Sequence, residues 1–311
     1  MTNTLAIVFP GQGSQSVGML NELYQQFAIV KHTFDEASAA LGYDLWALVA
    51  NGPEADLNET QRTQPALLTA SVAVWRLWQQ QGGATPAYFA GHSLGEYSAL
   101  VCAGVLSLAD AVKLVEKRGS YMQQAVPAGV GAMSAIIGLD DAAIALACQQ
   151  AAQGEVVSPV NYNSPGQVVI AGHQAAVERA GELCKAAGAK RALPLPVSVP
   201  SHCALMRPAA EQLATDLAAL NFNDAVIPVV NNVDVAVAAD SHAVKDALVR
   251  QLYSPVQWTQ TIEWLAAQGI TEVVELGAGK VLSGLIKRID KNLSSTSVGD
   301  IASLQSALAA E

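Results

Sequence analysis

One short motif in the sequence has the composition and spacing of a nucleophilic site. Residues 91–95, GHSLG, form a G-x-S-x-G pattern that follows a strand-like segment, Tyr88 to Ala90, and precedes helical sequence. In that setting a sharp turn exposes the serine hydroxyl at the end of a sheet, and the flanking glycines leave room for the turn. A serine that only caps a helix is the simpler alternative. The glycines and the preceding strand favour Ser93 as a nucleophile.

The segment that follows Ser93 is suited to stabilise a negative charge. Leu94 to Gly104 is apolar on nearly all sides, which predicts a buried helix whose N-terminus lies at Ser93. The N-terminal end of a helix carries a partial positive charge. An oxyanion formed at Ser93 would therefore be favoured there.

A serine nucleophile needs a base, and histidine is the usual one. His202 stands in the segment PSHC at 200–203, where the chain passes from one predicted lobe to another, and so it can reach a cleft between them. A purely structural histidine is the alternative. The remaining histidines fit surface or packing roles, or point away from Ser93: His32, His92, His173 and His242.

A single arginine breaks the pattern of the helix predicted from Ser107 to Gln124. At 100° per residue, Arg118 falls on the apolar stripe, while Lys113 and Lys117 lie on the opposite side. An inward charge can bind an anionic substrate group. It can equally extend to solvent or pair with a structural carboxylate.

Two glycine-containing segments do not fit nucleotide-binding motifs. The loop GQGSQ at 11–15 has Ser16 where a dinucleotide-binding loop needs glycine, and Gly279-Lys280 lacks the other residues of a P-loop. The first loop can instead present backbone N–H groups beside the serine, as an oxyanion hole requires.

The elements that must position these residues alternate between strand and helix. Strands are predicted at Leu5–Phe9, Tyr88–Ala90, Ile227–Val230 and Thr271–Glu275. Because helical sequence separates them, we expect an α/β-hydrolase-like lobe with a short parallel sheet, formed by residues 1–128 and 198–311. Residues 129–197 read as βαββαβ, the order of a small ferredoxin-like lobe inserted into the larger one. The Ser/Ala-rich segment after Leu293 is predicted to be frayed.

Composition excludes several functional classes. The 311 residues are 51% apolar and 14% charged, and the net charge of -10 argues against nucleic-acid binding. No apolar run is long enough to span a membrane, and the N-terminus lacks the basic start of a secretory signal, so a cytoplasmic protein is expected. The four cysteines show no metal-binding spacing and are expected to be buried free thiols, with no metal site.

With these residues in view, the sequence strongly resembles the bacterial malonyl-CoA:acyl carrier protein transacylases of fatty acid synthesis. The resemblance covers nearly the whole chain. It is carried by residues 9–15 (FPGQGSQ), 63–66 (TQPA), 91–97 (GHSLGEY), 161–167 (NYNSPGQ), 200–202 (PSH) and 275–277 (ELG).

The resemblance implies a role for each candidate residue. Ser93 would be the nucleophile and His202 its base, oriented by a carbonyl oxygen of Gln251. The backbone N–H groups of Gln12 and Leu94 would form the oxyanion hole, and Arg118 would bind the free carboxylate of the malonyl group. The enzyme would transfer malonyl from malonyl-CoA to the phosphopantetheine thiol of acyl carrier protein by a ping-pong route, with no cofactor.

An acidic carrier protein would need a basic surface. Lys280, Lys287 and Lys291 have the spacing of one stripe on a C-terminal helix, with Arg288 beside it, although an ordinary solvated face would look the same. Two other functions remain open. A serine esterase or thioesterase would use the same motif, normally with an acid behind the histidine, and an interaction subunit would keep only the fold.

Overall fold

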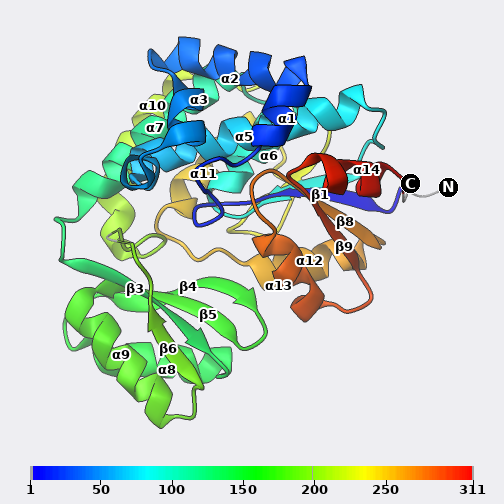
Figure 1. Ribbon diagram of the computed structural model, residues 1–311. Helices are drawn as coiled ribbons and strands as arrows, with labels where there is room; N and C mark the ends of the chain where they lie inside the picture. Colours follow the sequence, from blue (N-terminus) through cyan, green and yellow to red (C-terminus); the bar gives the residue numbers. More distant parts are fainter. Residues whose placement is uncertain (1–2, 198, 310–311) are drawn as a thin grey trace.

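The computed structural model describes residues 3–197 and 199–309 and contains two β-sheets with helices packed on them (Figure 1). The larger sheet has five strands in the order β7-β2-β1-β8-β9, and every neighbouring pair is parallel. Its strands are β1 (Leu5–Phe9), β2 (Tyr88–Gly91), β7 (Val229–Val230), β8 (Glu272–Leu276) and β9 (Ser294–Val298).

Helices cover both faces of the parallel sheet because its strands are apolar on both sides. Along β1, Leu5, Ile7 and Phe9 pack into one cluster of buried side chains, and Ala6 and Val8 pack into another. The first cluster includes α5, α6 and α7, and the second includes α12 and α13. The helices outside the smaller sheet are α1 (Asn21–Gln26), α2 (Ala28–Leu41), α3 (Leu45–Asn51), α4 (Glu54–Leu57), α5 (Thr60–Gln80), α6 (Leu94–Cys102), α7 (Leu108–Ala125), the 3-10 turn η1 (Ala204–Met206), α10 (Arg207–Ala219), α11 (Ser241–Gln251), α12 (Trp258–Ala267), α13 (Val281–Ile289) and α14 (Ile301–Ala309).

The smaller sheet is antiparallel and has the strand order β4-β5-β3-β6. Its two helices pack on one face, where Ile136, Val168 and Ile170 are buried. The other face, with Met133 and Val160, packs against Cys203 of the main body. Its elements in chain order are β3 (Gly131–Ile137), α8 (Asp141–Ala152), β4 (Val157–Ser164), β5 (Gln167–His173), α9 (Gln174–Ala186) and β6 (Arg191–Pro194).

Strand β4 ties this sheet to the body of the protein. The N–H of Val256 donates to the carbonyl of Val160, and the N–H of Tyr162 donates to the carbonyl of Val256. A mixed α/β fold with one parallel and one antiparallel sheet is thus confirmed.

The C-terminal segment is ordered, so the prediction of a frayed end after Leu293 was wrong. Strand β9 pairs in parallel with β8, and α14 buries Leu304 and Ala307. The Asp300 carboxylate accepts a hydrogen bond from the Ser303 N–H at the start of α14. A helix cap and a few apolar residues at the right positions therefore outweigh the small-residue composition of this segment.

The structure also gives information on membrane-spanning helices, cysteines and metal-binding clusters, which the composition addressed. Within residues 3–197 and 199–309, no helix is both long and apolar enough to cross a membrane. All four cysteines are buried and free, as expected. Over the same residues there is no cluster of three or more His, Cys, Asp or Glu side chains that could hold a metal ion.

Candidate active site

Ser93 lies in the sharp turn between β2 and α6, in a strained backbone conformation with a positive φ of 51° and ψ of -106°. Such a conformation is costly for a residue with a side chain and is kept only where surrounding contacts impose it. The Ser93 N–H donates to Oδ1 of Asn232 at 2.7 Å, and Nδ2 of Asn232 donates to the Gly91 carbonyl at 2.6 Å. Asn232 thus closes the turn from the side of β7.

His202 reaches the Ser93 hydroxyl, with 2.8 Å between Nε2 and Oγ. Its Nδ1 lies 2.7 Å from the carbonyl oxygen of Gln251, the last residue of α11. A carbonyl oxygen only accepts, so Nδ1 carries the proton and Nε2 presents its lone pair to the serine. The final carbonyls of a helix have no partner within it, which leaves this one free to hold the imidazole.

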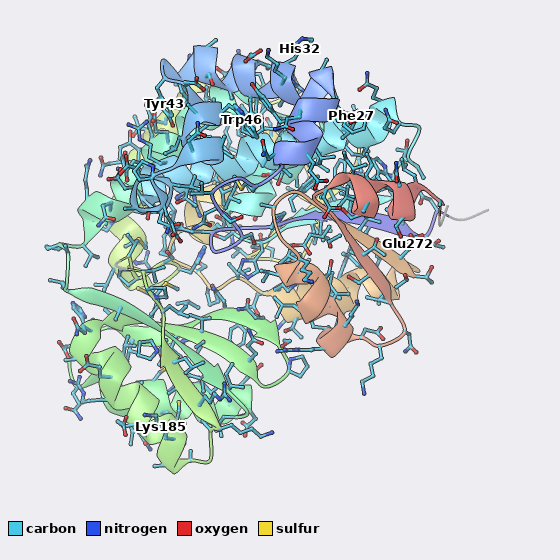
Figure 2. The ribbon with its side chains drawn as sticks, in the orientation of Figure 1. Phe27, His32, Tyr43, Trp46, Lys185 and Glu272 are labelled. Atoms are coloured by element: carbon cyan, nitrogen blue, oxygen red, sulfur yellow. The ribbon has the colours of Figure 1, made fainter. Side chains whose placement is uncertain are left out.

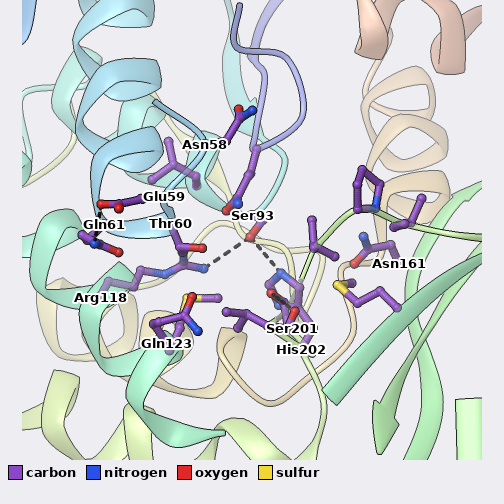
Figure 3. Close-up of a pocket in the computed structure, with 18 of the residues that line it drawn as sticks. Asn58, Glu59, Thr60, Gln61, Ser93, Arg118, Gln123, Asn161, Ser201 and His202 are labelled. Carbon is purple, nitrogen blue, oxygen red and sulfur yellow. Dashed lines mark hydrogen bonds between the residues drawn. The ribbon is translucent and has the colours of Figure 1, made fainter. Parts of the chain in front are cut away.

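Arg118 lies on the buried side of α7, with 1% of its surface exposed. Its Nη2 donates to Oε1 of Gln251 at 2.9 Å and to Oγ of Ser93 at 3.3 Å, and its Nη1 donates to Oε1 of Gln64 at 2.8 Å. Figure 3 shows the guanidinium and the imidazole on opposite sides of the Ser93 hydroxyl. Among the described residues, the acceptors of the guanidinium are the neutral oxygens of Gln64, Ser93 and Gln251, and no carboxylate is hydrogen-bonded to it.

These side chains line a cavity of about 460 Å³. Its walls come from the β1 loop, α4 and α5, α7, and two strands of the antiparallel sheet, β3 and β4. Gln12 and Leu94 line the same cavity. Within the described residues, the backbone N–H of neither one has an acceptor. The cavity is large enough for a small acyl group and the end of its carrier.

Burial sets the protonation of the site. Burial and the nearby positive charge of Arg118 together lower the pKa of His202 to about 3, so the imidazole is neutral at pH 7. Burial also lowers the pKa of Arg118 from its ordinary value. A guanidinium nevertheless stays protonated in proteins. The free site therefore offers a neutral base and a cation next to one hydroxyl group.

Comparison with known proteins identifies the family. The family described as acyl transferase domain matches residues 6–305. The malonyl CoA-acyl carrier protein transacylase of Salmonella typhimurium is 67% identical over 97% of this chain and 98% of its own. That of Escherichia coli strain K12 is 66% identical over the same shares. The chain belongs to the malonyl CoA-acyl carrier protein transacylases.

Solved structures of this family have the same fold. The crystal structure of an acyl carrier protein S-malonyltransferase from Vibrio cholerae is 68% identical, with a TM-score of 0.96 over 97% of this chain and 99% of that one. A malonyl-transacylase in complex with its type II PKS acyl-carrier protein is 61% identical, with a TM-score of 0.98 over 99% of both chains.

The other histidines of this transacylase lie away from the Ser93 hydroxyl. His32 is on the exposed face of α2 (Figure 2) and His242 is exposed on α11. The Nδ1 of His173 accepts a hydrogen bond from the Val156 N–H, and Nε2 of His92 lies 2.8 Å from Oδ1 of Asn163. The structure therefore brings together Ser93, His202, Gln251, Arg118, Gln12 and Leu94, the whole set expected from the sequence.

Three further residues around the site were not singled out from the sequence. Gln64 contacts Arg118, Asn232 closes the turn at Ser93, and Glu96 contacts both Gln251 and Asn232. A charged residue on an otherwise largely apolar helix could have indicated Glu96. Gln64 stands among other polar residues at the start of α5 and has no such signal. Asn232 lies in a loop, where no pattern marks it.

Proposed function

We propose that Ser93 carries the malonyl group as an ester during its transfer from malonyl-CoA to acyl carrier protein. The relatives at 63–67% identity are malonyl CoA-acyl carrier protein transacylases, and this chain has the same activity. One observation supports the role of Ser93 above all others. Its Oγ is hydrogen-bonded both to a neutral imidazole and to a buried guanidinium.

In the first half-reaction, Oγ of Ser93 attacks the thioester carbonyl carbon while its proton moves to Nε2 of His202. The carbonyl oxygen becomes negative and accepts hydrogen bonds from the N–H groups of Gln12 and Leu94. The carbon–sulfur bond then breaks, and the leaving thiolate of coenzyme A takes the proton from His202. A malonyl-serine ester and free coenzyme A result.

In the second half-reaction, the phosphopantetheine thiol of the carrier protein enters the same cavity. His202 takes the thiol proton, the sulfur attacks the ester carbon, and the carbon–oxygen bond to Ser93 breaks. The proton returns from His202 to Oγ. Because the leaving group of the first half-reaction and the acceptor of the second are thiols of the same type, one dyad serves both directions.

Gln251 takes the place that an acidic residue holds in many serine hydrolases. Its carbonyl fixes the Nδ1 tautomer of His202, and the C-terminal end of α11 favours the imidazolium that forms during each half-reaction. A neutral carbonyl stabilises this cation less than a carboxylate does. That property suits a freely reversible transfer between two thioesters.

Arg118 is the proposed binding group for the free malonyl carboxylate. Among the described residues its hydrogen-bond acceptors are neutral oxygens, so a carboxylate can replace them and form charge-assisted hydrogen bonds. An acetyl group leaves the cation without that partner in a desolvated cavity. The preference for malonyl over acetyl would therefore arise both from the bound carboxylate and from the cost of leaving Arg118 without a partner.

The carrier protein is proposed to dock on a basic surface formed by Lys280, Lys287, Arg288 and Lys291, all of which are exposed. The prediction that these residues share one helix was wrong, since α13 spans only Val281–Ile289. Asp290 has an extended backbone that ends the helix before Lys291, and Lys280 precedes it. The solved complex of a relative with its acyl-carrier protein supports a protein partner of this kind.

We further propose that residues 129–197 form a separate ferredoxin-like lobe inserted into an α/β-hydrolase-like lobe of residues 1–128 and 198–311. The βαββαβ element order and a cluster of buried side chains of its own support this division. Residue 198, at one boundary, lies outside the described residues.

We also propose that the enzyme acts without a cofactor and that it serves fatty acid synthesis. A cytoplasmic location stays a prediction.

The experiment that tests this function separates transfer from hydrolysis. Brief exposure of the purified protein to malonyl-CoA should add one malonyl group, mapped to Ser93 by peptide mass analysis. The adduct should then pass faster to the thiol of holo carrier protein than to water. A serine esterase or thioesterase would release malonate instead, and an interaction subunit would not be acylated.

A further inference from the structure

Glu96 is a buried acidic residue that the proposed reaction does not use. It lies on α6, three residues after Ser93, and only 2% of its surface is exposed. Glutamate is rarely buried unless its carboxylate has specific partners. Here a single oxygen, Oε2, accepts hydrogen bonds from two different parts of the chain.

The first connection runs from Glu96 to Arg118. Oε2 of Glu96 accepts from Nε2 of Gln251 at 2.8 Å, and Oε1 of Gln251 accepts from Nη2 of Arg118 at 2.9 Å. A guanidinium can only donate and an ionised carboxylate can only accept. The Gln251 amide, which lies between Arg118 and Glu96, can therefore adopt only one orientation, with its oxygen toward Arg118 and its nitrogen toward Glu96.

The second connection runs from Glu96 to the turn at Ser93. The same Oε2 accepts from the backbone N–H of Asn232 at 3.0 Å. The Asn232 side chain in turn accepts from the Ser93 N–H and donates to the Gly91 carbonyl. The contact with Glu96 thus fixes the backbone of Asn232, the residue that holds Ser93 in its positive-φ conformation.

We propose that Glu96 is a positioning residue, whose acceptor oxygen fixes the Arg118 guanidinium through Gln251 and the Ser93 turn through Asn232. This inference rests on the proposed roles of Ser93 and Arg118. Both ends of the network meet at the Ser93 hydroxyl, where Arg118 is hydrogen-bonded to Oγ. One carboxyl oxygen thereby sets the nucleophile and the carboxylate-binding group relative to each other.

The role requires an acceptor rather than a negative charge. An amide oxygen in place of Oε2 can accept from the same two N–H groups. Glu96 also lines a second cavity of about 340 Å³, apart from the one at Ser93, into which an amide nitrogen could point. Glutamine should therefore substitute for Glu96, whereas alanine should not.

The test compares Ser93 acylation by malonyl-CoA and acetyl-CoA in Glu96→Ala, Glu96→Gln and a matched control. Ser98→Ala is the control, because Ser98 is on the same helix, equally buried, and its Oγ has no hydrogen-bond partner among the described residues. Thermal denaturation of each variant checks that it is folded. If the alanine variant is insoluble, Glu96→Asp replaces it, since its carboxylate is one methylene short of both donors.

We expect Glu96→Ala to slow malonyl loading by about 10- to 100-fold, the usual effect of misplacing reacting groups by up to 1 Å. Acetyl loading, which needs the Ser93 turn but not the Arg118 clamp, should slow less, so that the malonyl-to-acetyl preference falls. Glu96→Gln should recover most of the rate and of the preference. The double variant Glu96→Ala/Gln251→Ala should have nearly the same malonyl-to-acetyl preference as Gln251→Ala alone. The single substitution of Gln251 already breaks the connection between Glu96 and Arg118.

Three results would overturn the proposal. These are a folded Glu96→Ala variant with normal rates and preference, a Glu96→Gln variant as impaired as alanine, or an equal loss for both acyl groups. A wild type and a Ser98→Ala control that are not acylated at Ser93 would instead contradict the proposed function.

Discussion

The guanidinium of Arg118 and the hydroxyl of Ser93 are hydrogen-bonded to each other, with 3.3 Å between Nη2 and Oγ. In a malonyl ester, one methylene group separates the ester carbonyl carbon from the free carboxylate. A carboxylate bound by Arg118 therefore places the neighbouring carbonyl close to Ser93. The short contact between Arg118 and Ser93 therefore serves two purposes. It places the group that binds the malonyl carboxylate beside the hydroxyl that attacks the carbonyl carbon.

The nucleophile and its base can be tested by single substitutions. Ser93→Ala should abolish the covalent malonyl adduct, since within residues 3–197 and 199–309 no other hydroxyl group is hydrogen-bonded to His202. His202→Ala should slow both half-reactions by about 10² to 10⁴, the usual contribution of a general base. Intact-mass measurements of the loaded protein and single-turnover transfer to carrier protein check these rates. Accumulation of a normal adduct in Ser93→Ala would show that another residue is acylated.

Arg118 should decide which acyl group is accepted. A charge-assisted hydrogen bond contributes about 1.5 to 3 kcal/mol, so loss of two should reduce kcat/KM for malonyl loading by about 100-fold or more in Arg118→Ala. Acetyl loading should fall little or rise. Arg118→Lys should rescue poorly, because an ammonium group cannot reproduce the planar fork of arginine. Side-by-side acylation by the two thioesters is the measurement, and an unchanged preference would return Arg118 to a structural role.

The low pKa of His202 predicts an unusual pH dependence. A base with a pKa of about 3 stays neutral on acidification far below the 6.5 of an ordinary histidine. Acetyl loading should therefore show no acid limb centred near 6.5. The profile is to be measured in the Glu96→Gln variant as well, since burial raises the pKa of the Glu96 carboxyl to about 7. A limb near 6.5 in both proteins would mean that His202 is solvated in solution.

The proposed carrier-protein surface predicts a defect confined to the second half-reaction. If the carrier protein is acidic, as proposed, Lys287→Glu with Lys291→Glu should slow transfer to it, most strongly at low salt, and leave malonyl-CoA loading intact. The control is Lys31→Glu with Lys113→Glu, which changes the net charge equally on α2 and α7, away from α13 (Figure 1). Equal effects of the two pairs would exclude a specific surface.

Two glycines predict opposite effects on stability. A Cβ on Gly95 would overlap the backbone of Phe9, so Gly95→Ala should lower the free energy of unfolding by about 1 to 3 kcal/mol or more and impair Ser93 acylation. A Cβ on Gly284, in α13, meets nothing within 4 Å. Gly284→Ala should instead stabilise by roughly 0.5 to 1 kcal/mol. Denaturant unfolding of both variants measures these changes in the free energy of unfolding. A Gly95→Ala variant as stable as wild type would contradict the prediction.

Local patterns were sufficient to predict much of the fold. The alternation of apolar strands and helices predicted β1, β2, β8 and the βαββαβ order, because each of these depends on periodicity within a few residues. The same reasoning failed for β9 and α14, whose small residues carry a weak pattern. Their order comes from pairing with β8 and from burial of Leu304 and Ala307, which are long-range effects.

The sequence by itself determined the chemical types at the site. The glycines around Ser93 predict a turn, and the position of Arg118 on its apolar stripe predicts a buried charge. Only the tertiary structure decided which groups meet. Ser93, Arg118, His202 and Gln251 come from four separate segments, and their contacts are 2.7 to 3.3 Å long. The same holds for Glu96, because its partners Asn232 and Gln251 lie 136 and 155 residues further along the chain and no local pattern encodes that approach.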